Sequence, residues 1–156
     1  MRVGRRMAVD VGKARLGVAV CDVEAILSSP LDALKRSSEI SQTVADLANL
    51  ANFYEVIEIY VGDPLSLSGK DTESTYDSRS IALELSNSLD IPVRMIDERF
   101  TTVSAANKLR AAGVNSKEAK SIIDSASAVE ILESAISSEK SSGMAPGQLV
   151  GDSVGA

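Results

Sequence analysis

Residues 7–22 carry the pattern that most restricts how this chain can fold, because two apolar runs there are separated by a very short polar turn. The segment reads MAVDVGKARLGVAVCD, and its turn is Gly12–Ala14. Alternation and β-branched residues predict strands over 3–11 and 15–22. A connection this short joins antiparallel neighbours. We therefore expect the chain to begin as a β-hairpin.

The remaining segments alternate between strand and helix patterns. Short strand segments at 25–29 and 31–35, interrupted by Pro30, suit the edge of a sheet. Apolar periodicity and capping residues then predict the following elements: helix 39–53, strand 56–61, loop 62–78 running into helix 73–89, strand 91–96, helix 102–112 and a helix from Asn115 or Ser116 to 138.

This order predicts an α/β fold with a mixed five-stranded sheet. Three strands with short connections form an antiparallel meander, and the later strand–helix–strand unit adds parallel strands. Helices are then expected on both faces of the sheet. The domain should span residues 1–139. The Gly- and Ser-rich residues 140–156 have the composition of a disordered tail.

The residue types present exclude several kinds of chemistry. The sequence has no histidine and only one cysteine, Cys21. Catalysis by Ser–His or Cys–His, zinc held by histidine and an internal disulfide are therefore excluded. No apolar stretch approaches the about 18 residues of a membrane span, so we expect a cytoplasmic protein. Acid, base or metal chemistry must come from carboxylates, Lys, Tyr or water.

Charge is unevenly distributed along the chain. The net charge is −6, which argues against a nucleic-acid partner at first sight. However, residues 1–36 and 99–120 carry more Lys and Arg than Asp and Glu, and the other segments are acidic. The two basic segments adjoin carboxylates at predicted strand ends, so a local face that binds anions is compatible with an acidic chain.

Two of these carboxylate positions follow apolar strands. Asp10 ends the run Met7–Val9, and Asp97-Glu98 follows the run 92–96. Ligands collect at the carboxyl ends of strands in open α/β sheets. The alternative for Asp10 is a turn residue that caps the hairpin. The alternative for Asp97-Glu98 is an ordinary loop in which Thr102 caps the next helix.

Asp124 is a third carboxylate in an unusual place. Helical spacing puts it on one stripe with Ala128, Ile131 and Ala135, which is the stripe expected to be buried. A buried carboxylate is costly unless it is paired or bound to a metal. Three such carboxylates without His or Cys suit Mg²⁺ or Mn²⁺. Two such ions can promote hydrolysis of a phosphodiester, with Lys13 and Arg15 contacting phosphates.

Four motifs resemble, in order, those of the YqgF (RuvX) family. They are DVGKARLGVA at 10–19, VGDP at 61–64, DERFTT at 97–102 and DSASA at 124–128. The resemblance covers about residues 3–138 and implies a ribonuclease H-like fold. The most specific part of the resemblance is DERFTT after a strand, together with Asp124 in a late helix. This chain departs from the usual family pattern at Asp63 and at Ser125 and Ser127.

The resemblance implies roles for eight residues. Asp10, Glu98 and Asp124 correspond to the catalytic carboxylates that bind the metal, taken as Mg²⁺ or Mn²⁺. The residues that correspond to substrate contacts are Lys13, Arg15, Arg99, Thr101 and Thr102.

The family is described as a nuclease for the 5′ end of pre-16S ribosomal RNA and as a Holliday-junction resolvase. We therefore expect a metal-dependent nuclease that acts on pre-rRNA, in contact with ribosomal precursor particles, as a monomer or weak homodimer. A resolvase acting on four-way DNA and a non-catalytic ribosome-assembly module are the alternatives. An actin-like ATPase would need a duplicated domain, for which 156 residues are too few.

Overall fold

The two apolar runs of residues 7–22 form the expected antiparallel hairpin. Strand β1 (Arg6–Val11) pairs with β2 (Arg15–Cys21), and this register places Asp10 opposite Gly17. The computed structural model describes residues 1–100 and 124–151. The other strands are β3 (Ser28–Pro30), β4 (Leu34–Lys35), β5 (Glu58–Asp63), β6 (Val93–Asp97) and β7 (Gln148–Leu149).

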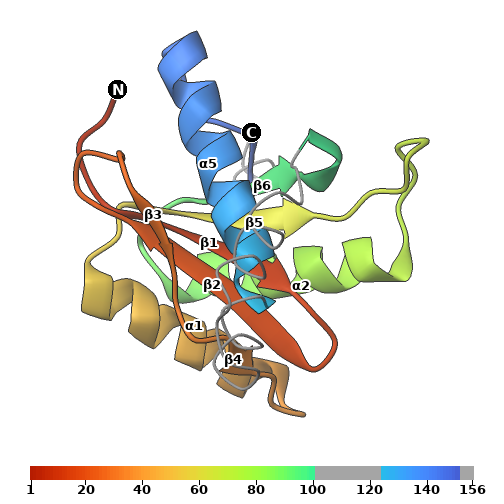
Figure 1. Cartoon of the computed structure of the whole chain (residues 1–156). Coiled ribbons are helices and arrows are strands. Elements are labelled where there is room, and N and C mark those ends of the chain that lie inside the picture. The colour runs from red at the N-terminus through yellow and green to blue at the C-terminus, as the bar shows by residue number, and fades with distance from the viewer. Residues whose placement is uncertain (101–123, 152–156) are drawn as a thin grey trace, which may run out of the picture.

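These strands form one mixed sheet (Figure 1). Its order is β3-β2-β1-β5-β6-β7, with β4 also paired to β2. The hairpin and its neighbours β3 and β4 are antiparallel, and β1, β5 and β6 run parallel. The mixed sheet predicted from the sequence is therefore confirmed. The segments expected at 25–29 and 31–35 form the short strands β3, which includes Pro30, and β4, and β7 is a strand of two residues that was not expected.

Helices cover both faces of the sheet. In the described residues they are α1 (Ile40–Tyr54), α2 (Glu73–Ser88) and α5 (Ala126–Ser142), and one 3₁₀ turn, η1 (Glu98–Phe100), follows β6. Successive strand residues face opposite sides: Met7 and Val9 join the core under α1 and α2, whereas Ala8 joins the core under α5. Figure 1 shows α5 crossing one face of the sheet. Ala128 and Ala135 are both buried there, as the sequence predicts for a helix that approaches the sheet closely.

The last described segment differs from the predicted disordered tail. Helix α5 continues past residue 139 to Ser142 and ends at Gly143, which has φ +74°. Residues 148–149 then form β7 against β6, and the Val150 N–H donates to the Val93 carbonyl at 2.8 Å. An open edge of β6 offers unpaired backbone groups, and composition alone does not reveal that a Gly- and Ser-rich segment will satisfy them.

Some predicted elements lie outside the described residues. These are the helix over 102–112 and the first part of the last helix, from 115 or 116 to 123. Within the described part, α5 begins at Ala126, with Ser125 at its N-cap. Asp124 therefore precedes α5 and does not lie on it. No helix in the part of the chain that the structure describes is long and apolar enough to cross a membrane.

Candidate active site

The carboxyl ends of the three parallel strands meet at one edge of the sheet. Asp10 lies one residue before the end of β1, and Asp63 and Asp97, which are register partners, end β5 and β6. Glu98 follows Asp97 and begins η1. The rule that strand ends gather ligands thus brings acidic residues from three strands to a single edge.

Asp10 and Glu98 contact each other at this edge, and both are half-buried. Burial raises the pKa of Glu98 to about 8, and the negative charge of Asp10 adds to the rise. Burial also raises the pKa of Asp10, although hydrogen bonds to Glu98 and Ser127 oppose this shift. Two carboxyl groups in contact stay ionised together only if a cation lies between them; otherwise they share a proton.

Gly62 provides the room that Glu98 occupies. A Cβ at Gly62 would lie 2.8 Å from the carboxyl carbon of Glu98 and 2.7 Å from Cδ1 of Ile131. Both distances are too short for any side chain, so glycine at this point of β5 lets Glu98 lie beside Asp10.

Asp124 faces a neighbouring cavity of about 290 Å³. The cavity is formed by the hairpin and is lined by Asp10, Gly12, Lys13, Ala14, Arg15, Gly17 and Asp124. Arg15 Nη1 donates to Asp124 Oδ2 at 2.9 Å. A Cβ at Gly17 would lie 2.1 Å from the Asp124 carbonyl oxygen. Glycine in β2 therefore permits the backbone of residue 124 to approach the strand.

The cations predicted to contact substrate are placed in different surroundings. Lys13 and Arg15 line the same cavity as Asp10 and Asp124. Arg99 pairs with Asp97, its Nη2 lying 2.6 Å from Oδ2. Thr101 and Thr102 lie outside the described residues. The structure therefore brings Lys13 and Arg15 together with two of the three predicted catalytic carboxylates.

The same carboxylates are the candidates for holding a metal ion. Among residues 1–100 and 124–151, no three carboxylate, histidine or cysteine side chains lie close enough together to hold one ion. Asp10 and Glu98 fit a hard divalent cation, because two oxygen-donor groups in contact need a positive charge between them. In this structure the carboxylate of Asp124 is bound by Arg15, so its role as a ligand stays a prediction.

Comparison with known proteins places the chain in a family. A model of the RuvX family, described as Holliday junction resolvase, matches residues 4–138. The chain belongs to the RuvX family. A relative from Clavibacter michiganensis subsp. michiganensis, named "Putative pre-16S rRNA nuclease", is 43% identical over 150 residues, which cover 96% of this chain and 93% of the relative. A relative of the same name from Streptomyces avermitilis is 46% identical over 149 residues, 95% of each chain.

Solved structures agree on the fold of this RuvX-family chain. RuvC from Thermus thermophilus has a TM-score of 0.61 at 17% identity, covering 94% of this chain and 99% of RuvC. RuvC in complex with a Holliday junction substrate gives a TM-score of 0.60 at 15% identity, with the same coverage. The family resemblance and the ribonuclease H-like fold predicted from the sequence are confirmed, and so is the broad class of enzyme, a nuclease.

Two serines support the site in ways that sequence reasoning missed. Ser125 Oγ accepts from the Val18 N–H at 3.1 Å and donates to the Leu31 carbonyl at 2.6 Å. Ser127 hydrogen bonds to Asp10. The sequence marks both serines only as polar interruptions of an apolar helix. Ser127 follows Asp124 by three residues, so the helix that the sequence predicts across both positions would have placed it beside the carboxylates.

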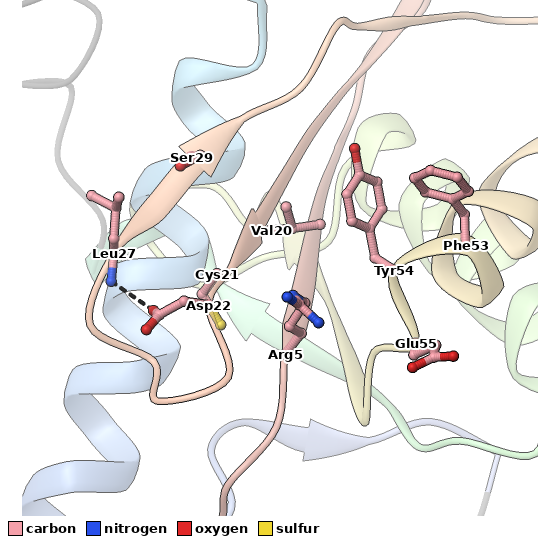
Figure 2. A pocket seen from close by; sticks show the side chains of 9 residues that line it. All are labelled: Arg5, Val20, Cys21, Asp22, Leu27, Ser29, Phe53, Tyr54 and Glu55. Atoms are coloured by element: carbon pink, nitrogen blue, oxygen red, sulfur yellow. Dashed lines mark hydrogen bonds between the residues drawn. The ribbon is translucent and has the colours of Figure 1, made fainter.

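A second hollow of the RuvX-family chain lies far from these carboxylates. Its volume is about 400 Å³, and Figure 2 shows its wall, which is lined by Arg5, Val20, Cys21, Asp22, Leu27, Ser29, Phe53, Tyr54 and Glu55. Arg5 precedes β1 and Cys21 ends β2, so this hollow is at the opposite end of the hairpin from Asp10. The larger hollow therefore does not coincide with the candidate active site.

Proposed function

We propose that this RuvX-family chain is a metal-dependent nuclease that hydrolyses phosphodiester bonds in the precursor of 16S ribosomal RNA, in the cytoplasm. The contact between the Asp10 and Glu98 carboxyl groups, beside a cavity lined by Lys13 and Arg15, carries the proposal. The names of the curated relatives support the choice of substrate.

The proposed cofactor is Mg²⁺ or Mn²⁺, held by Asp10 and Glu98 and completed by Asp124. When bound, such ions supply an activated water and stabilise the charge on the leaving oxygen. Arg15 engages Asp124 through Oδ2 at 2.9 Å, and the other carboxylate oxygen would be the one to hold the ion, since carboxylates that bind a metal are commonly hydrogen-bonded in turn. Arg15 lines the same cavity as Lys13, so both side chains are placed to contact a phosphate of the substrate.

The other side chains then have distinct tasks in the proposed reaction. Lys13 and Arg15 bind phosphates of the nucleic acid, for which a guanidinium is suited by its forked donors. Ser127 keeps the Asp10 carboxyl group oriented through its hydrogen bond. Arg99, Thr101 and Thr102 are proposed substrate contacts from the matching motif, and Arg99 must first exchange its bond with Asp97.

Substitution of Asp10 tests this proposal. In Asp10→Asn, cleavage of a precursor 16S RNA fragment with Mg²⁺ or Mn²⁺ should fall by at least about 100-fold, because the charge that holds the ion is removed. Asp90→Asn is a matched control, since Asp90 is exposed and precedes β6, at the end of that strand opposite Asp97. Cleavage that survives in Asp10→Asn, or in the presence of a chelator, would contradict the proposal.

A Holliday-junction resolvase is the second candidate, favoured by the description of the family model. Resolution of a four-way junction needs a dimer that holds two sites apart, so this reading requires a homodimer. Size-exclusion chromatography and parallel cleavage assays on RNA and on four-way DNA separate the two candidates. A strict monomer that is inactive on four-way DNA would refute the resolvase. A wild-type chain that binds precursor RNA but cuts neither substrate would point to the non-catalytic assembly module.

A further inference from the structure

Arg36 connects the hairpin turn of the candidate active site to helix α2. Its Nη1 donates to the Gly12 carbonyl at 3.0 Å and to Asp77 Oδ2 at 2.6 Å. Its Nη2 donates to Asp77 Oδ1 at 2.6 Å. The backbone N–H of Arg36 also donates to the Ala14 carbonyl at 3.0 Å. One residue thus binds the carbonyls on both sides of Lys13.

We call the contacts of Arg36 with Gly12, Ala14 and Asp77 the clamp. Its anchor, Asp77, is held firmly in place. The forked pairing of Arg36 with Asp77 is the strong bidentate type, and the hydrogen bond from Arg36 holds the pKa of Asp77 below its usual range. Asp77 lies in the first half of α2, a helix that begins with a capping box between Thr72 and Thr75. Further along, α2 buries Ile81 and Leu85 in the core. The turn is therefore tied to a packed helix.

Lys13 lies between the two clamped carbonyls and lines the cavity shared with Asp10 and Asp124. It is exposed. An exposed lysine on an unclamped turn would lose more conformational freedom when it binds a phosphate, and that loss weakens binding. A fixed backbone removes part of this cost.

We infer that Arg36, anchored by Asp77, is a positioning residue that holds the 12–14 turn so that Lys13 meets a phosphate of the nucleic acid. The inference rests on the proposed function and deepens it by identifying how this site holds its substrate. Arg36 acts through Lys13 and not on the reacting atoms. Its loss should therefore raise KM and leave kcat nearly unchanged.

Asp77→Ala provides the sharpest test, because charge and clamp predict opposite results. Removal of a carboxylate near a polyanion site should tighten RNA binding through charge alone, whereas loss of the anchor should weaken it. We expect binding of a fluorescent precursor 16S RNA fragment, measured in a chelator, to weaken about tenfold. Asp71→Ala is the matched control: it also removes an aspartate paired with an arginine, Arg79, and should not weaken binding.

A double-mutant cycle asks whether the clamp works through Lys13. Lys13→Ala and Asp77→Ala should each weaken binding about tenfold, and the double variant should be no weaker than Lys13→Ala alone. Arg36→Lys keeps the charge but loses the fork, so it should resemble Asp77→Ala. Thermal unfolding of each variant confirms that it is folded.

The outcomes separate this inference from the proposed function. Two results would overturn the clamp even if the wild-type chain cleaves RNA. One is that Asp77→Ala binds the RNA as tightly as Asp71→Ala. The other is that the losses of RNA affinity in Lys13→Ala and Asp77→Ala multiply in the double variant. A wild-type chain that binds RNA without cleaving it would overturn the nuclease, and the cycle would still decide on the clamp. A wild-type chain that does not bind RNA would overturn both.

Discussion

Ser125→Ala should destabilise the fold and disturb the candidate site together. The Ser125 side chain accepts from the buried Val18 N–H and donates to the Leu31 carbonyl, so alanine leaves both backbone groups without this partner. Each buried unsatisfied group costs about 1–3 kcal/mol. With one bond buried and the other partly buried, the free energy of unfolding should fall by about 2–4 kcal/mol in all. For a chain of this size that loss lowers Tm by roughly 5–15 °C.

Thermal and urea unfolding followed by circular dichroism measure this loss. An unchanged m-value would show that the change lies in stability and not in the compactness of the unfolded chain. Ser141→Ala is the control: its hydroxyl is exposed and donates only to carbonyls of its own helix, so the cost should stay within about 0.5 kcal/mol. Equal costs for the two variants would refute the view that Ser125 fixes the start of α5 on β2.

Other substitutions and conditions test neighbouring parts of the structure. Gly17→Ala would bring a Cβ to 2.1 Å from the Asp124 carbonyl oxygen; because that atom belongs to the backbone, we expect a loss of about 1–3 kcal/mol in thermal unfolding, and a stability equal to wild type would argue against the close approach. Burial alone would raise the pKa of Glu58, but hydrogen bonds from Arg2, Arg94 and Tyr60 outweigh it and hold this pKa below its usual value. The stability that these bonds add is present above the unfolded pKa of about 4.3 and is lost as the pH falls through the folded pKa. Glu58→Gln should therefore reduce the loss of stability at acid pH. An equal loss in the variant and the wild type would count against this role of Glu58. Mg²⁺ or Mn²⁺ should raise the Tm of the wild-type chain more than that of Asp10→Asn, and equal shifts would locate the bound ion elsewhere.

The arrangement of the sheet could be predicted from the sequence because it depends on local patterns. Alternation and a three-residue turn give the hairpin, and apolar periodicity gives α1 and α2 to within about two residues at each end. Strand-end position likewise brings Asp10 and Glu98 to one edge without any knowledge of distances. Such features depend on the spacing of residues along one element or on a general rule for parallel strands.

Features that depend on contacts between distant segments could not be predicted in this way. The sequence shows no cation on the helical stripe of Asp124, yet Arg15 binds it from β2, more than 100 residues earlier. Ser125 fixes the start of α5, at Ala126, against β2. In the sequence, Ser125 is only a polar residue within an apolar helix pattern. Strand β7 forms because β6 has an edge to pair with. Each case depends on a partner that only the folded chain supplies.

Ion pairing distinguishes the acidic residues that gather near this edge of the sheet. Three of them are bound by arginine: Asp63 by Arg79, Asp97 by Arg99 and Asp124 by Arg15. A carboxylate paired in this way attracts a metal ion less, because the guanidinium already offsets its negative charge. Asp10 and Glu98 contact each other, and their burial favours the proton-bound form. A divalent cation that replaced this proton would gain attraction from both groups, so Asp10 and Glu98 should contribute most to holding an ion, and Asp124 less while it is paired with Arg15.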